Sequence, residues 1–310
     1  MVVHVLMLPN AMQHKAGALA RVVGTNVSDY LGRTALAQWS KTCKEGAQMR
    51  ADLEQTCKEK EGYRGAYNEE NTVTADGLLV INAEWMWDAT WMVDRRIRRV
   101  VLLPGVQAVA DHAFQDCEQL VSVSMPDSVA AVGRYAFSGC YCLESVNIPS
   151  RVRDLWGVFY GCCALTTVTL PHGLKRIGTN TFAGCSSLAS LKLPASLTTI
   201  WSGAFELCRG LTTLVVPDAV ASIGYSAFAQ CSGLQTVVLP EQLQRIEEFT
   251  FFQCTNLAFI NIPRNVQRVE PRAFGGCVHL KTVVVSDTTM VCANSFERAT
   301  VVVPRPPNFC

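Results

Sequence analysis

The sequence predicts a solenoid of the α/β class, in which short coils of one repeated unit stack along a common axis. Phenylalanine recurs eight times at steps of 23 residues, with one step of 22, and a cysteine stands three residues after each one. A fixed period of this length is typical of a stacked repeat, whose core grows lengthwise with every added unit. The repeated residues are Phe114, Phe137, Phe159, Phe182, Phe205, Phe228, Phe251 and Phe274, followed by Cys117, Cys140, Cys162, Cys185, Cys208, Cys231, Cys254 and Cys277.

Each unit contains two apolar segments and a turn. The first segment, residues 143–149 in one copy, alternates as a half-buried strand does and ends in a proline, which has no ladder donor to give. The second is an apolar pair such as Leu174 and Ile177, often followed by a glycine where the chain turns a corner. The Ala-Phe-x-x-Cys-x-x-Leu segment then predicts a short helical or 3₁₀ turn on the outer side, with phenylalanine in the core.

This unit, Leu-x-x-Val-x-Leu-Pro…Val-x-x-Ile-Gly…Ala-Phe-x-x-Cys, resembles the 23-residue leucine-rich repeat of the BspA-like (Treponema-type) family over residues 76–303. The resemblance implies a curved, right-handed solenoid with a parallel β-sheet on its concave side. It also implies a non-enzymatic role in binding proteins or surfaces. The pattern departs at Leu155-Trp156, where the glycine shifts by one, and at Ser286, which replaces the proline.

The chain divides by composition into five parts. A helical N-terminal segment is indicated by Ser28-Asp29, which can cap a helix, and by an apolar face of Leu36, Trp39, Cys43 and Ala47. Trp85, Trp87 and Trp91 are expected to cover the open end of the first repeat. The predicted parts are a helical segment 1–62, a linker 63–75, an N-terminal cap 76–100, a solenoid 101–303 and a tail 304–310.

Residues 27–47 are similar to the middle of an F-box, a small helical module that docks on a Skp-type adaptor of cullin ubiquitin ligases. The usual Leu-Pro opening is not at the matching distance, because Leu8-Pro9 lies far upstream. The resemblance implies an adaptor as a second partner and a role as a ubiquitin-ligase substrate receptor.

Charge and hydropathy argue against several classes of partner. A formal net charge of +1 is too low for a dedicated nucleic-acid surface. No apolar run approaches the ~18 residues that would predict a membrane span. The first residues lack the basic start of a secretion signal, so we expect a cytoplasmic protein, with a nuclear or a secreted one as the alternatives.

The repeated cysteines predict a column of reduced thiols in the core, since free cysteine is readily buried. Neighbouring coils ~4.8 Å apart would also permit disulfides, so the sequence leaves that alternative open. No close two-plus-two cysteine arrangement predicts a zinc site. The five histidines occupy unrelated repeat positions and no phosphate loop is present, so no catalytic, metal or cofactor site is predicted.

Two sets of residues are candidates for partner binding. The outward strand positions read mainly as short hydroxyls and valine, and they predict a flat, weakly charged face that includes Thr167, Thr169, Lys192, Thr213, Thr236, Phe259 and Asn261. The second apolar segments predict an interrupted basic stripe along one edge, made of Arg153, Lys175, Arg176, Arg245 and Arg268.

The leading functional hypothesis is a non-enzymatic, intracellular solenoid that binds a protein partner. The alternatives are the F-box-type substrate receptor and a surface-exposed or secreted adhesin.

Overall fold

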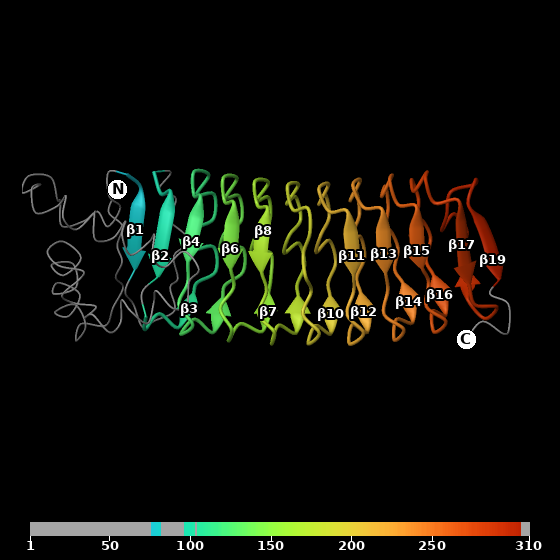
Figure 1. Ribbon diagram of the computed structural model, residues 1–310, viewed down its shortest axis with the longest axis horizontal. Helices are drawn as coiled ribbons and strands as arrows, with labels where there is room; N and C mark the ends of the chain where they lie inside the picture. Colours follow the sequence, from blue (N-terminus) through green and yellow to red (C-terminus); the bar gives the residue numbers. More distant parts are fainter. Residues whose placement is uncertain (1–75, 82–95, 103, 305–310) are drawn as a thin grey trace, which may run out of the picture.

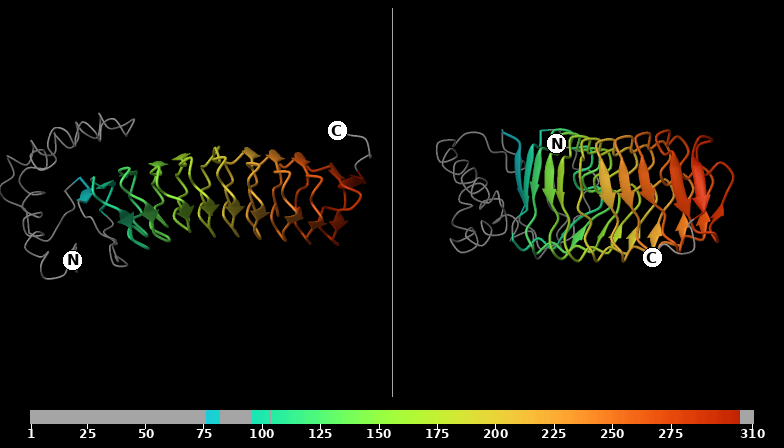
Figure 2. Two further views of the ribbon diagram at one scale, coloured as in Figure 1. Left: turned by 90° about the horizontal axis from the view of Figure 1, so that it is seen from below. Right: turned by 45° about the vertical axis from the view of Figure 1, so that its right-hand side comes forward.

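The computed structural model describes residues 76–81, 96–102 and 104–304, which form a solenoid of about 9 parallel-stranded turns. Figure 1 shows the coils side by side from one end of this array to the other, and the views of Figure 2 show the same elongated stack. None of the described residues is helical. The predicted helical segment, its F-box-like part, the linker, the three cap tryptophans and the last six residues lie outside the described ranges.

The first apolar segment forms a strand, as predicted, in every described unit but the one around Lys192. These strands run parallel along one side of the stack in three sheets, which we call the first ladder (Figure 1). Its register joins residues one repeat apart, for example Ser145 with Thr167. The strands are β1 (Leu78–Ile81), β2 (Arg99–Leu102), β4 (Ser122–Ser124), β6 (Ser145–Asn147), β8 (Thr167–Thr169), β11 (Thr213–Val215), β13 (Thr236–Val238), β15 (Phe259–Asn261), β17 (Thr282–Val285) and β19 (Val301–Pro304).

The first ladder is interrupted where a strand was predicted around Lys192. Residues 190–192 form no strand, so the ladder breaks between β8 and β11, although Leu191 and Leu193 are buried as the pattern requires. Nothing in the structure explains this break. Lys192 is exposed, but it does not lie on a strand.

The second apolar segments form a second parallel ladder, which the sequence pattern did not predict. A strand of two residues is too short for alternation to reveal, because only one residue points inward. The strands are β3 (Ala108–Val109), β5 (Ala131–Val132), β7 (Asp154–Leu155), β9 (Arg176–Ile177), β10 (Thr199–Ile200), β12 (Ser222–Ile223), β14 (Arg245–Ile246), β16 (Arg268–Val269) and β18 (Met290–Val291).

The outer segment is a series of turns, so the predicted helical or 3₁₀ turn is wrong. The residues two before and two after each core phenylalanine have positive φ, as Tyr135 (54°) and Gly139 (72°) do around Phe137. Backbone hydrogen bonds within the turn alternate with backbone hydrogen bonds to the next coil. Ser138 N–H donates to Tyr135 O, whereas Phe137 N–H donates to Val158 O at 3.0 Å. A helix cannot propagate through left-handed residues that send every second donor to a neighbouring coil.

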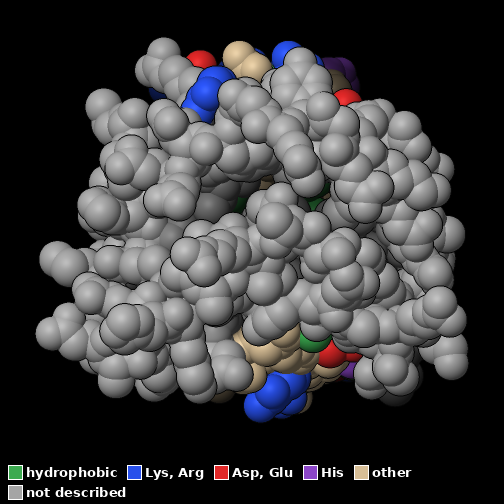
Figure 3. All heavy atoms as spheres, turned by 90° about the vertical axis from the view of Figure 1, so that its left-hand side faces the viewer, with side chains coloured by type: hydrophobic (Ala, Val, Ile, Leu, Met, Phe, Trp, Pro, Cys, Tyr) green, Lys and Arg blue, Asp and Glu red, His purple; other side chains and the backbone are tan. Residues whose placement is uncertain are grey.

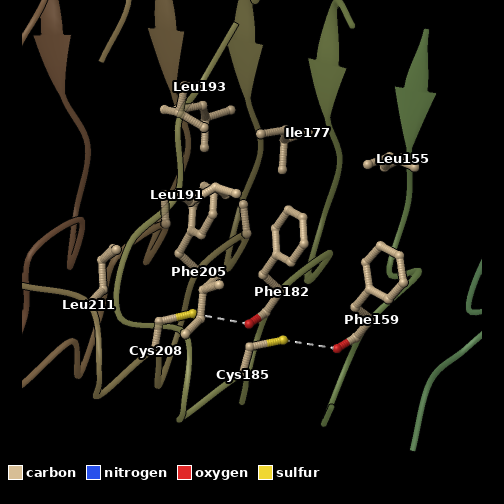
Figure 4. Packing of buried hydrophobic residues seen from close by; sticks show 14 of the residues in the cluster. Leu155, Phe159, Ile177, Phe182, Cys185, Leu191, Leu193, Phe205, Cys208 and Leu211 are labelled. Atoms are coloured by element: carbon tan, nitrogen blue, oxygen red, sulfur yellow. Dashed lines mark hydrogen bonds between the residues drawn. The ribbon is translucent and has the colours of Figure 1, made fainter. Parts of the chain in front are cut away.

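The core phenylalanines stack in one column through the stack of coils. The rings of Phe182 and Phe205 are 5.3 Å apart at 14° (Figure 4). Those of Phe205 and Phe228 are 5.2 Å apart at 5°. All eight rings from Phe114 to Phe274 are fully buried. Since each ring packs mainly on its counterparts in the adjacent coils, one coil alone would leave its main core residue in water.

The repeated cysteines form a second buried column, and they are free thiols as predicted. The Cys208 thiol donates to Phe182 O at 3.1 Å, and the Cys185 thiol donates to Phe159 O at 3.2 Å (Figure 4). Burial is the main cause that raises the pKa of the Cys231 and Cys277 thiols to about 12. Among the described residues, no cysteine pair forms the alternative disulfide between coils.

Candidate binding surfaces

The outward side chains of the first ladder form one surface, which we call the first-ladder face. Thr167, Thr169 and Thr213 are exposed there, and Thr236 and Asn261 are half-buried. These residues line up along the stack, because the strand register places Thr213, Thr236 and Phe259 in one column. The first-ladder candidates on strands therefore share one face, with Lys192 at its interruption.

The C-terminal half of the first-ladder face is apolar. Val215 is 66% exposed and Phe259 59%, and Val238 and Val284 are also exposed. Val215, Val238 and Asn261 are paired across β11, β13 and β15, and β15 contacts β17, which carries Val284. Sequence reasoning placed Val215 and Val238 among the outward strand positions, but of these apolar residues it named only Phe259 as a candidate.

The basic stripe predicted along one edge lies at the second ladder. It separates into one group at Arg153, Lys175 and Arg176 and another at Arg245 and Arg268, because the intervening strands β10 and β12 carry Thr199 and Ser222. Opposite charges also accompany the arginines, so the stripe is not a continuous basic field.

Arg176 is paired across strands with Asp154, since its Nη2 lies 3.0 Å from Asp154 Oδ2. This hydrogen bond is the main cause that raises the pKa of the Arg176 guanidinium. Viewed from the N-terminal end, Lys and Arg side chains appear beside Asp and Glu at both rims of the array (Figure 3). The charges thus favour mixed pairing over recognition of a polyanion.

Arg245 and Arg268 are neighbours in register on β14 and β16, where like charges repel. Glu270 offsets this repulsion, because its Oε1 lies 2.8 Å from Arg268 Nε and 3.5 Å from Arg245 Nη1. The two arginines border an open groove of about 300 Å³ that is also lined by Gln244, Gln267 and Met290.

The described residues contain no cluster of metal-binding side chains. In those ranges, no group of three or more His, Cys, Asp or Glu side chains could hold a metal ion. The same part of the chain contains no helix that could cross a membrane.

Stacked coils, two parallel ladders and an aromatic core define this protein as a leucine-rich repeat solenoid. The model of the BspA-type leucine-rich repeat region matches residues 94–156 and 156–281 in 6 copies. The chain therefore belongs to the BspA-type leucine-rich repeat family, which confirms the resemblance stated from the sequence. Such solenoids are typically non-enzymatic scaffolds used for protein–protein interaction.

Several solved bacterial structures are similar to the chain. A leucine-rich repeat protein of Treponema pallidum is 30% identical, with 67% of this chain and 86% of that one covered and a TM-score of 0.45. A leucine-rich cell surface protein of Faecalibacterium prausnitzii is 22% identical, with 73% and 78% covered and a TM-score of 0.41. The pneumococcal vaccine antigen PcpA is 15% identical, with 74% and 68% covered and a TM-score of 0.46. A search of curated proteins finds no match.

Proposed function

We propose that this solenoid is a scaffold that binds a protein partner through the first-ladder face. The observation that carries the proposal is the row of exposed apolar side chains at Val215, Val238, Phe259 and Val284. An apolar area of a few hundred Å² on a soluble protein is commonly an interaction site. Other outward strand positions carry threonine, so the area has a polar rim of the kind found around protein interfaces.

The shape and charge of the face indicate the kind of partner. Alternate residues of parallel strands point to the same side and make a flat surface. Among the described outward positions from Thr167 to Val284, Lys192 is the only charged residue. A flat, weakly charged protein surface is complementary to it. The family resemblance assigns this face to the concave side, where a partner would also contact the threonines of β8.

The compartment belongs to the same proposal. The buried column of free thiols suits a reducing environment, so we place the protein inside the cell. The similar cell surface protein of F. prausnitzii supports the adhesin alternative. A thiol titration after unfolding distinguishes the intracellular protein from the adhesin, because an intracellular protein should yield all 14 cysteines as free thiols. The F-box reading and its Skp-type adaptor stay predictions.

Chemical cross-linking of the full chain in lysates, followed by mass spectrometry, tests the binding face. We expect the partner to be lost from the double variant Val215→Lys/Phe259→Lys. It should be retained by Ser222→Lys/Met290→Lys, which places the same charges on exposed residues of the second ladder. Equal capture by both folded variants would refute the assignment to the first-ladder face.

A further inference from the structure

We propose that this protein has a second binding surface, which takes a neutral polysaccharide along an aromatic corner of the solenoid. The corner is the strip of residues that follows each second-ladder strand and precedes each core phenylalanine. Its large side chains are Tyr135, Trp156, Trp201, Tyr225 and Phe249, one each from five coils. This strip is separate from the first-ladder face and goes beyond the proposed protein-binding function.

The aromatic rings of the strip contact each other from coil to coil. Trp156 and Trp201 are 5.3 Å apart although a whole coil lies between them in the sequence. Tyr225 and Phe249 are 5.4 Å apart in an edge contact. Trp201 is 41% exposed and Tyr225 51%, in contrast to the fully buried rings of the core column. The rings therefore form a surface and are not an extension of the core.

Glycines lie beneath two of the rings and let them pack closely on the backbone. Several atoms of the Trp156 ring lie where a side chain at Gly178 would begin, so the ring rests on the backbone of that coil. The Tyr135 ring covers Gly157 in the same way, with its Cζ 2.8 Å from the position of an added Cβ. Tyr135 also stacks on His112, with the two ring centroids 5.5 Å apart, so the rings that offer an open face are the exposed ones, Trp201 and Tyr225. Sugar rings pack on such faces, because their C–H groups meet the negative face of the aromatic quadrupole.

The central part of the strip has no charge and is rich in hydroxyl and amide groups. Between Trp156 and Tyr225 the polar residues of the strip are Thr179, Asn180, Thr181 and Ser202, and its other residues are glycines, Val158, Ala204 and Trp201. Polar groups of this kind can exchange hydrogen bonds with sugar hydroxyls, whereas a polyanion would need a basic field. This composition favours a neutral glycan over nucleic acid or a sulfated chain.

Arginines stand over the rings at both ends of the uncharged part. The guanidinium carbon of Arg134 lies 5.9 Å from the centroid of Trp156, and that of Arg272 lies 5.9 Å from the centroid of Phe249. Coils ~4.8 Å apart place Trp156 and Tyr225 ~14 Å from each other along the axis. The platform is thus long enough for several consecutive sugar rings of an extended chain.

Affinity electrophoresis of the full chain tests the proposal with laminarin, hydroxyethylcellulose and mannan as the neutral probes, and dextran sulfate as the charged one. We expect at least one neutral probe to retard the protein, without retardation by dextran sulfate. Trp201→Ala and Tyr225→Ala should each raise the apparent Kd about tenfold, the order found for stacking on a single aromatic ring. Phe259→Ala removes an equally exposed ring from the first-ladder face and should leave the Kd unchanged.

The urea midpoint of each variant is measured as a control for folding. If Trp201→Ala is destabilised, the change in Kd is taken from Tyr225→Ala. Failure of all three neutral probes to retard the protein would overturn the proposal. Retardation that neither variant weakens, or that dextran sulfate reproduces, would overturn it as well. Binding of a proline decapeptide, but of no polysaccharide, in a Trp201-dependent way would reassign the strip to peptides. None of these outcomes bears on the first-ladder face, which the cross-linking experiment tests independently.

Discussion

The buried thiol column should make the protein unusually sensitive to alkali. Burial raises the pKa of seven core thiols, those of Cys140, Cys162, Cys185, Cys208, Cys231, Cys254 and Cys277. A group whose pKa is higher in the folded state contributes stability that is fully present below its unfolded pKa and is lost as pH rises toward its folded pKa. The relevant window here runs from about pH 9 to about pH 12.

The size of the effect follows from the number of thiols. At pH 10, one unit above the ordinary thiol pKa of 9.0, ionisation favours the unfolded chain by ~1.4 kcal/mol for each thiol. The folded thiols stay protonated at that pH, so seven of them together remove ~10 kcal/mol. Typical domains have a free energy of unfolding of ~5–15 kcal/mol, so we expect the solenoid to unfold near pH 10.

Urea unfolding followed by circular dichroism at pH 7, 8, 9 and 9.5 measures this loss. The midpoint should be constant up to pH 8 and then fall steeply. Cys208→Ser removes one core thiol and leaves a hydroxyl to donate to Phe182 O, so its midpoint should fall less between pH 8 and 9.5. Cys142→Ser/Cys163→Ser removes two exposed thiols and should reproduce the pH dependence of the unmodified chain.

A midpoint that stays constant from pH 8 to pH 9.5 would refute this reasoning. So would a fall that the exposed-thiol variant reduces and the Cys208 variant does not, because the loss would then come from surface groups.

Three further predictions concern packing and backbone. Phe205→Ala should lower the free energy of unfolding in urea by ~3–5 kcal/mol. Phe296→Ala should lower it distinctly less, because Phe296 is half-buried and its only described ring stack is on Phe274 of the preceding coil. Equal losses would contradict the stacking argument. Gly178→Ala should cost ~1–3 kcal/mol in the same assay, since its Cβ would meet Leu155 O at 2.5 Å as well as the Trp156 ring. Leu207→Gly should be neutral or stabilise by up to ~1 kcal/mol, because Leu207 has a φ of 62°; a clear loss of thermal stability would show that its side chain matters more than its backbone.

The inner positions of the solenoid could be predicted from the sequence because packing repeats with the chain. The steps between Phe114 and Phe274 revealed one buried residue per coil, and the same period placed the cysteines in a second buried column. Phe182 stacks on Phe205 of the next coil, and the Cys208 thiol donates to the carbonyl of Phe182 in the preceding coil, so one period in the sequence becomes one column in space. Interior contacts of this kind require no knowledge of how distant segments meet.

The turns and the outer surfaces could not be predicted in the same way. Tyr135, Leu207 and Gln230 adopt positive φ without the glycine that usually signals it, because hydrogen bonds to the next coil hold the backbone there. The pairing of Arg176 with Asp154 is equally invisible, since it depends on the register of two strands whose existence the pattern did not indicate. Candidate residues selected by charge alone therefore included arginines that are already partnered.

The residue directly after the second-ladder strand alternates between glycine and tryptophan in five successive coils, from Gly133 to Gly224. Glycine fits this corner at Gly133, Gly178 and Gly224, where the chain turns against the preceding coil. Trp156 and Trp201 occupy the same position in the intervening coils, so the corner tolerates a large ring only beside a glycine that makes room for it. Neither ring fills the core, which the phenylalanine column already occupies. Trp201, which is 41% exposed, and the half-buried Trp156 are accommodated by the fold without filling its core, and this alternation is the strongest reason to test the aromatic corner.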